Sequence, residues 1–216
     1  MNFFFDPTIP GKLDKIKKLP PTRGFCVVAD IVDSVKQKDK PTAEWACLFS
    51  NTLRMVRSIL CGGGIQKVIG DAVMGFITEK EFYKVGMNSM LHQFCGLVDL
   101  AREFNPPHGL PVKLSIVYCV DAYELSFIED VPDVYGKDID LTFRLVSKAK
   151  EREVLMNKGL YDCLSRECDD MSNTQPAHIL YSQIQGPEKM KIRGFREPVS
   201  VYKLPVNPSL PTTQQV

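Results

Sequence analysis

Residues 24–33 read GFCVVADIVD, and the predicted sheet is built outward from them. Phe25 to Ala29 are mostly apolar, uncharged and rich in Val, which predicts a buried strand. This run ends on Asp30. A second apolar run, Val68 to Gly70, is followed by a second carboxylate, Asp71. Because each strand delivers a carboxylate at its end, we expect Asp30 and Asp71 to hold a divalent cation between two segments of the chain.

The composition is that of an ordinary globular domain, with 44% apolar and 25% charged residues. A chain of 216 residues is long enough for one domain with a substantial core, whereas two would be cramped. The 27 basic and 26 acidic residues nearly balance, so nucleic acid and anionic membranes are not expected as partners. No run of about 18 apolar residues is present to span a membrane. The seven cysteines are scattered without a zinc-binding spacing, which predicts reduced thiols in a cytoplasmic protein.

The chain divides into an N-terminal arm at 1–23, one domain at 24–204 and a C-terminal tail at 205–216. The arm holds four prolines and a lysine-rich patch, and we expect it to lie over the domain or over a neighbouring molecule. The order of elements, βαββαββ, predicts an α+β fold: a ferredoxin-like (βαββαβ) antiparallel sheet with helices on one face. Periodicity and turn signals predict helices at 42–60, 80–104, 137–149 and 157–164, a loop at 166–177, and strands at 24–29, 65–69, 73–77, 112–120, 123–127, 153–156, 178–182 and 198–204.

Four blocks of sequence occur in an order that matches a known family. They are ADIVDS (29–34), KVIGDAVMGF (67–76), DVYGKDIDLTFRL (133–145) and IRGFREPVSVYKL (192–204). Together they resemble the catalytic domain of class III nucleotide cyclases, the adenylate/guanylate cyclase superfamily, from about residue 24 to residue 204. The resemblance implies a lyase that converts a nucleoside triphosphate to a 3′,5′-cyclic mononucleotide and pyrophosphate.

The resemblance implies a centre with two metal ions. Asp30 and Asp71 match the family aspartates that bind a pair of divalent ions, and the backbone carbonyl of Ile31 matches a further ligand. One ion lowers the pKa of the attacking ribose hydroxyl, and the other neutralises charge on the leaving pyrophosphate. Oxygen ligands favour Mg²⁺ or Mn²⁺. The alternative is that Asp30 caps a helix and Asp71 is only a turn residue.

The triphosphate and the transition state are assigned to residues further along the chain. Arg144 matches the family arginine on the triphosphate, where a guanidinium fork suits phosphate oxygens. Asp140, four residues earlier on the same helix face, stands where the family usually has Asn. We take Asp140 and Arg144 as catalytic, with an internal Asp140–Arg144 ion pair as the alternative. Arg193 falls at the position of a triphosphate-binding lysine.

The resemblance also has departures. After the first metal aspartate the family commonly has Gly and then Thr, whereas this chain has Asp33 and Val35. The loop should donate backbone N–H groups to phosphates, so a carboxylate there disfavours binding. A catalytically degenerate domain that only binds nucleotide is therefore an alternative. A third hypothesis is an interaction protein that uses the fold only to dimerise.

Base recognition is implied for Lys67 and Asp133, which match the Lys and Asp of adenylate-type members. A donor beside an acceptor suits adenine, but it suits uracil and cytosine equally. Thr142 and Phe143 replace a small Ala-Ala pair, so Phe143 either narrows the pocket or fills core. The bare domain resembles the stand-alone bacterial pyrimidine cyclases of the Pycsar antiphage systems. This favours UTP or CTP, with cyclic UMP or CMP read by a separate effector in antiviral defence; the alternative is an adenylate cyclase making cyclic AMP from ATP.

Catalysis in the family needs a dimer, and a homodimer is therefore expected. In the family's head-to-tail arrangement, the metal aspartates of one protomer face the base and triphosphate residues of its partner. A homodimer then carries two composite sites. The two sets are Asp30 and Asp71 on one side, and Lys67, Asp133, Asp140, Arg144 and Arg193 on the other.

Overall fold

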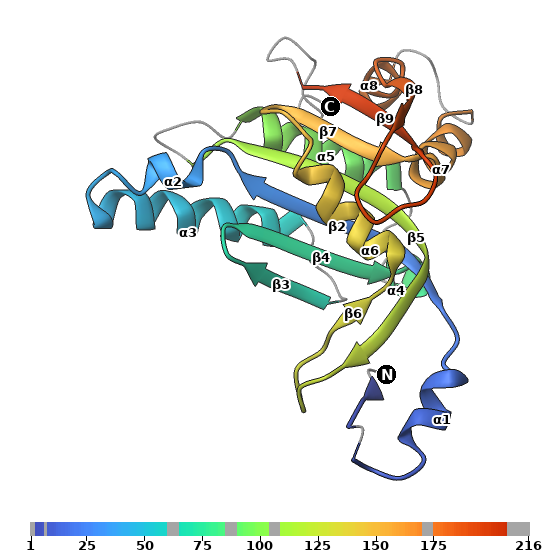
Figure 1. Cartoon of the computed structure of the whole chain (residues 1–216). Helices are drawn as coiled ribbons and strands as arrows, with labels where there is room; N and C mark the ends of the chain where they lie inside the picture. Colours follow the sequence, from blue (N-terminus) through green and yellow to red (C-terminus); the bar gives the residue numbers. More distant parts are fainter. Residues whose placement is uncertain are drawn as a thin grey trace.

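The structure is a computed structural model that describes residues 3–6, 8–59, 65–84, 90–103, 109–169 and 175–206. Within these residues the chain forms a nine-stranded sheet in the order β3-β4-β2-β5-β7-β9-β8, with β1 and β6 each paired to β5 (Figure 1). The strands are β1 (Phe3–Phe4), β2 (Thr22–Ile31), β3 (Ile65–Ile69), β4 (Ala72–Thr78), β5 (Val112–Ser126), β6 (Val134–Tyr135), β7 (Glu153–Asn157), β8 (Gln185–Met190) and β9 (Val199–Pro205). The helices are α1 (Lys12–Lys17), α2 (Ser34–Gln37), α3 (Thr42–Ile59), α4 (Glu79–Lys84), α5 (Met90–Glu103), α6 (Lys137–Val146), α7 (Lys158–Asp169) and α8 (Pro176–Tyr181).

Strand β2 lies in the middle of the sheet, as its apolar sequence predicts. It pairs antiparallel with β4 on one side and with β5 on the other. Residues 24–29 are all buried, whereas Asp30 is only partly buried. A strand with paired neighbours on both edges leaves no backbone group exposed, which suits an uncharged run. The strand therefore carries Asp30 to one end of the buried sheet.

Both faces of the sheet are covered, because successive side chains of a strand point to opposite faces. Phe25, Val27 and Ala29 share a core with α3, α5, α7 and α8. Cys26 and Val28 share a second core with α6, which Figure 1 shows in front of β2. The predicted α+β fold is confirmed, with the difference that α6 lies on the other face from the remaining large helices. The sheet is also not wholly antiparallel, since β7 and β1 run parallel to β5.

Strand β5 differs from its prediction. Two strands were expected at 112–120 and 123–127, but the structure has one continuous strand of 15 residues. Its first part pairs with β2 and β7, and its last part pairs with β1 and β6. Because every part finds a partner strand, the polar residues near Asp121 do not interrupt it.

The C-terminal third contains the other differences. The expected strand at 178–182 is wrong, because this segment forms α8, which starts with Pro176 at a position that favours a helix. The strand that pairs with β9 is β8, further along the chain. Helix α7 extends into the expected loop at 166–177. The expected helix at 80–104 is described as α4 and α5, and residues 85–89 between them lie outside the described residues, as do residues 60–64 and 207–216.

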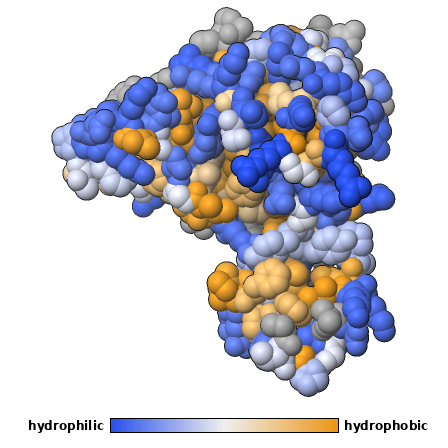
Figure 2. Space-filling model, in the orientation of Figure 1, coloured by the Kyte–Doolittle hydropathy of each residue, from blue (hydrophilic) through white to orange (hydrophobic). Residues whose placement is uncertain are grey.

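A lower lobe projects from the sheet, formed by residues 3–6 and 8–19 with residues 122–135. Strand β1 lies beside the end of β5, with which it pairs (Figure 1). The ammonium group of Lys12 donates a hydrogen bond to the carbonyl of Phe4 at 3.0 Å. Figure 2 shows hydrophobic residues gathered on its surface. Among them Phe127 is 51% exposed and Ile128 67% exposed. Among the described residues, no helix is both long and apolar enough to cross a membrane.

Candidate functional site

The two predicted metal aspartates lie on neighbouring backbone segments at one end of the sheet. In the β2–β4 pair, Asp30 is opposite Ala72, the residue directly after Asp71. The N–H of Ile31 donates to the carbonyl oxygen of Asp71 at 3.4 Å. Gly70 supplies the left-handed turn between β3 and β4, with φ 64°. Strand pairing thus brings together the backbones of two aspartates that lie far apart in the sequence.

The donor set fits a hard cation. Asp30 lies within β2 and caps no helix, so that alternative is wrong, while Asp71 does lie in the turn. Among the described residues there is no group of three or more His, Cys, Asp or Glu that could hold a metal. Mg²⁺ is commonly bound by one or two carboxylates together with water and substrate phosphates. Asp30, Asp71 and the carbonyl of Ile31 match that pattern.

A cation of the protein already contacts one of these two aspartates, Asp30. The ammonium group of Lys113 lies 2.9 Å from Oδ2 of Asp30, and both side chains are only about one-fifth exposed. The contact follows from strand register, since Asp30 and Lys113 are opposite each other in β2 and β5. Sequence reasoning missed Lys113. The available signal was a single lysine near the start of an apolar strand, where burial requires a partner for the charge.

The two predicted base-recognition residues are in contact. Lys67 on β3 and Asp133, just before β6, form an ion pair through Oδ1 of Asp133. The same oxygen accepts the N–H of Val134 at 2.6 Å, and Oδ2 accepts the hydroxyl of Tyr135 at 2.8 Å. Partial burial lowers the pKa of Lys67, but the contacting carboxylate favours its charged form. We therefore treat the pair as ionised, with a donor and an acceptor side by side.

The three predicted triphosphate and transition-state residues line one cavity of about 600 Å³, between α6 and the loop before β9. Among the described residues no ion pair joins Asp140 to Arg144, so the alternative of an internal pair is wrong. Cationic side chains predominate around the cavity, which suits a polyanion. Lys137 and Arg196 were not predicted, although both lie within the quoted blocks. Lys137 follows Gly136, and Arg196 follows Phe195. The lining residues are Lys137, Asp140, Arg144, Arg193, Gly194, Phe195 and Arg196.

Helix α6 is held in place by aspartates at its start. The carboxylate of Asp121 accepts the N–H groups of Lys137 at 3.1 Å and Asp138 at 3.0 Å. The carboxylate of Asp138 accepts the N–H of Val120 at 2.8 Å. Burial raises the pKa of Asp138, and the neighbouring carboxylate of Asp121 adds to the rise. Gly136 is required here, because a Cβ atom would lie 2.4 Å from the carbonyl oxygen of Asp121.

Further along α6, Thr142 and Phe143 both pack toward the core. Thr142 is fully buried, and its hydroxyl donates to the carbonyl of Asp138 at 2.8 Å. Phe143 packs against the core beneath α6. Of the two alternatives for Phe143, the structure favours core. Asp33 adopts a left-handed conformation and pairs with Lys36 at 2.8 Å on the surface, which offsets part of its charge.

Within one chain, the predicted residues form separate groups. Among the described residues, no hydrogen bond or ion pair connects Asp30 or Asp71 to the cationic cavity at α6. A single protomer therefore contains three groups: the aspartates Asp30 and Asp71, the Lys67–Asp133 pair, and the cationic cavity. Among the described residues, the aspartates make no direct contact with the cavity. This separation is compatible with a site completed by a second protomer.

Sequence comparison matches no protein-family model and no curated protein. Solved structures do match. The adenylyl cyclase CyaB from P. aeruginosa is 20% identical, with a TM-score of 0.58 covering 86% of this chain and 96% of that chain. An adenylate cyclase from Trypanosoma brucei, solved in its monomeric state, is 18% identical, with a TM-score of 0.59 covering 88% and 91%. The guanylate cyclase domain of RhGC from Catenaria anguillulae, solved in complex with GTP, is 12% identical, with a TM-score of 0.59 covering 86% and 97%. The chain thus has the fold of adenylyl and guanylyl cyclase domains.

Proposed function

We propose that this protein is a nucleotide cyclase, which converts a nucleoside triphosphate to a 3′,5′-cyclic mononucleotide and pyrophosphate. The observation that carries the proposal is the β2–β4 pairing, which sets Asp30 beside Asp71 on a cyclase-type fold. In this assignment Asp30, Asp71 and the carbonyl of Ile31 hold two Mg²⁺ or Mn²⁺ ions. The ions supply a lowered pKa for the attacking 3′-hydroxyl and charge neutralisation for pyrophosphate.

The remaining residues bind and orient the nucleotide. Arg144 and Arg193 contact the triphosphate from the cationic cavity, and Arg144 stabilises charge that develops in the transition state. Asp140 is placed on the same helix face, one turn before Arg144. Lys67 and Asp133 present a donor and an acceptor to the edge of the base. Lys113 would compete with a metal ion for Asp30, because its ammonium group already engages Oδ2 of that carboxylate.

The active form in this proposal is a homodimer with two composite sites. Asp30 and Asp71 of one protomer act with Lys67, Asp133, Asp140, Arg144 and Arg193 of its partner. The test is complementation: Asp71→Ala and Arg144→Ala variants are each inactive, and mixing them restores partial activity through one intact site per mixed dimer. No recovery over a range of mixing ratios would overturn the shared site while leaving a monomeric cyclase possible.

We propose that the preferred substrate is a pyrimidine nucleotide, UTP or CTP. The product, cyclic UMP or cyclic CMP, then acts as a messenger in cytoplasmic antiviral defence and is bound by a separate effector. The donor–acceptor pair of Lys67 and Asp133 also suits adenine, so an adenylate cyclase is the second candidate. A domain that binds nucleotide without turnover is the third, and the surface carboxylate of Asp33 is the feature that favours it.

The deciding experiment incubates the purified protein with ATP, GTP, CTP and UTP separately, with Mn²⁺ and with Mg²⁺, and identifies the products by mass. Asp71→Ala is the inactive control. We expect one cyclic pyrimidine nucleotide, absent from the control. Cyclic AMP alone would overturn the pyrimidine preference and keep the cyclase. Absence of any cyclic product, with thermal stabilisation by one of the nucleotides, would favour the binding domain instead.

A further inference from the structure

Tyr135 links the base-recognition pair to the lower lobe. It is the last residue of β6, and its side chain is 41% exposed. Its hydroxyl donates to Oδ2 of Asp133 at 2.8 Å. The ammonium group of Lys67 lies 5.8 Å from the centre of its ring, a distance at which the ring face attracts a cation. A single aromatic side chain therefore contacts both members of the pair.

The carboxylate of Asp133 is held through both of its oxygens. A carboxylate turns easily about the bond to its own Cβ, because that torsion has broad energy wells. The ion pair with Lys67 and the N–H of Val134 both engage Oδ1. The hydroxyl of Tyr135 is the described partner of Oδ2. Because the carboxyl group is planar, contacts to either oxygen restrain this same torsion, and the hydroxyl of Tyr135 adds a restraint from the Oδ2 side.

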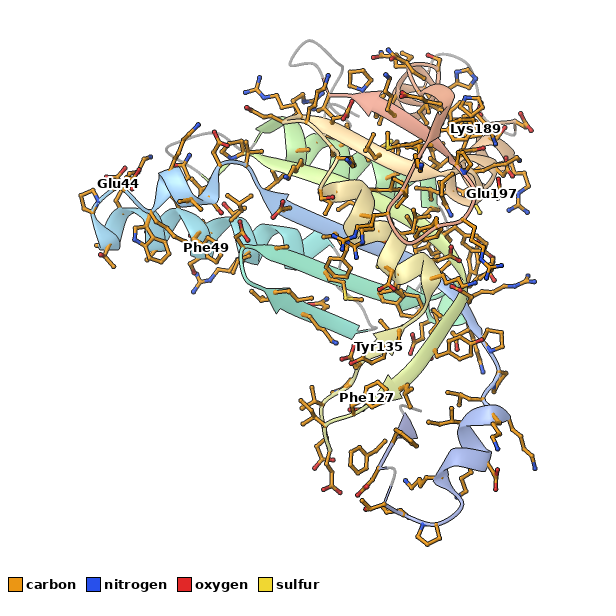
Figure 3. All side chains as sticks on the ribbon, viewed as in Figure 1. Glu44, Phe49, Phe127, Tyr135, Lys189 and Glu197 are labelled. Carbon is orange, nitrogen blue, oxygen red and sulfur yellow. The ribbon has the colours of Figure 1, made fainter. Side chains whose placement is uncertain are left out.

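The ring of Tyr135 is itself held by other aromatic rings. Its centre lies 5.0 Å from the ring of Phe127 in an edge-to-face arrangement, and Figure 3 shows the two side chains close together on the lower lobe. Phe127 in turn packs edge-to-face with Phe5, at 5.9 Å. The N–H of Phe5 donates to the carbonyl of Ser126 at 2.7 Å, so the N-terminal segment is tied to β5. Such ring pairs stabilise one orientation of each ring.

We propose that Tyr135 is a positioning residue for base recognition: its hydroxyl helps to hold the Asp133 carboxylate in the orientation that presents an acceptor to the base, and so biases which base edge the site accepts. The inference rests on the proposed function, because it assumes that Lys67 and Asp133 meet the base. Tyr135 then contributes to discrimination between bases, and turnover of a bound nucleotide does not depend on it.

The test compares Tyr135→Phe, which keeps the ring and its packing on Phe127, with the matched control Tyr83→Phe. Tyr83 is also exposed, at 52%, and none of its described contacts involves Lys67 or Asp133. kcat and KM are measured for all four nucleotides. We expect Tyr135→Phe to lower kcat/KM for the preferred nucleotide about tenfold, the effect of one hydrogen bond to a charged group. The change lies in KM, and the least preferred nucleotides change by about twofold or less, so selectivity falls.

A purely structural role would lower kcat/KM equally for every base, and that result, or selectivity within about twofold of wild type, would overturn the proposal. Tyr83→Phe is expected to match wild type throughout. Nucleotide binding, measured by thermal stabilisation in the presence of Ca²⁺, separates this inference from the proposed function. If the wild-type protein binds one nucleotide selectively but never converts it, the cyclase proposal is wrong. The inference about Tyr135 then still requires that Tyr135→Phe reduce the binding selectivity. A wild type that neither binds nor converts any nucleotide overturns both.

Discussion

Replacement of Lys113 by Met tests whether this lysine competes with a metal ion for the carboxylate of Asp30. The change removes an ammonium group 2.9 Å from Oδ2 of Asp30 and keeps an apolar chain of similar length. At an effective dielectric constant of about 20, two unit charges at this separation attract by about 6 kcal/mol before desolvation is counted. Exposed pairs contribute about 0–1 kcal/mol net, and removing one partner of a buried pair costs about 3–5 kcal/mol. With both side chains about one-fifth exposed, we expect a loss of about 2 kcal/mol in the free energy of unfolding.

The variant has two measurable consequences of opposite sign. Without metal, a loss of about 2 kcal/mol lowers Tm by about 4–8 °C for a domain of this size. With metal, the carboxylate of Asp30 is free of its competitor, so the Kd for Mn²⁺ falls by up to about 30-fold, the equivalent of the same 2 kcal/mol. Calorimetric Mn²⁺ titration without nucleotide measures the second effect, and thermal melting measures the first.

The control is Lys203→Met, which removes another strand lysine, 3.6 Å from Glu188 at the β8–β9 pair. It should leave Mn²⁺ affinity unchanged. Asp30→Asn should abolish the Mn²⁺ response in either background. If Lys113→Met lowers Tm but binds Mn²⁺ no more tightly than wild type, then the lysine stabilises the fold without competing for the metal, and the reasoning is refuted.

Three further predictions concern α6 and its cavity. Arg196→Gln should raise KM severalfold and leave kcat within about twofold, since it removes a contact to the triphosphate that is equally strong in the ground state and the transition state. Lys191→Gln on the same loop is the control. An equal rise in KM for both variants would argue against a specific role of Arg196. Gly136→Ala should cost about 2 kcal/mol or more because its Cβ atom meets a backbone carbonyl at 2.4 Å, and an unchanged denaturation midpoint would contradict this. Burial raises the pKa of Asp138, so the folded protein holds this proton more tightly than the unfolded chain does. The contribution of Asp138 to stability therefore falls as pH rises from about 4 through the raised pKa. Asp138→Asn, which keeps an acceptor for Val120, should therefore gain stability relative to wild type as pH rises over that range; parallel curves of Tm against pH would exclude the effect.

Local patterns were sufficient for the parts of the site that lie within one element. The apolar run of β2, the turn at Gly70 and Asp71, and the helix that carries Asp140 and Arg144 all follow from residues close in the chain. The strand expected at 178–182 shows the limit of such patterns. A short apolar segment suits a helix or a strand, and here the packing of Leu180 into the core selects the helix.

The sequence by itself determined that a carboxylate lies close to the end of each of two strands, and that a helix with Asp140 and Arg144 and a basic loop follow, because hydrophobic period and turn residues act over a few positions. Only the tertiary structure decided that α6 covers the face opposite the other large helices, that Lys113 meets Asp30, and that the hydroxyl of Tyr135 reaches Asp133. These contacts depend on strand register and on which face of a sheet is covered. A shift of one residue in register would turn each of these side chains to the other face, and no local pattern specifies that choice.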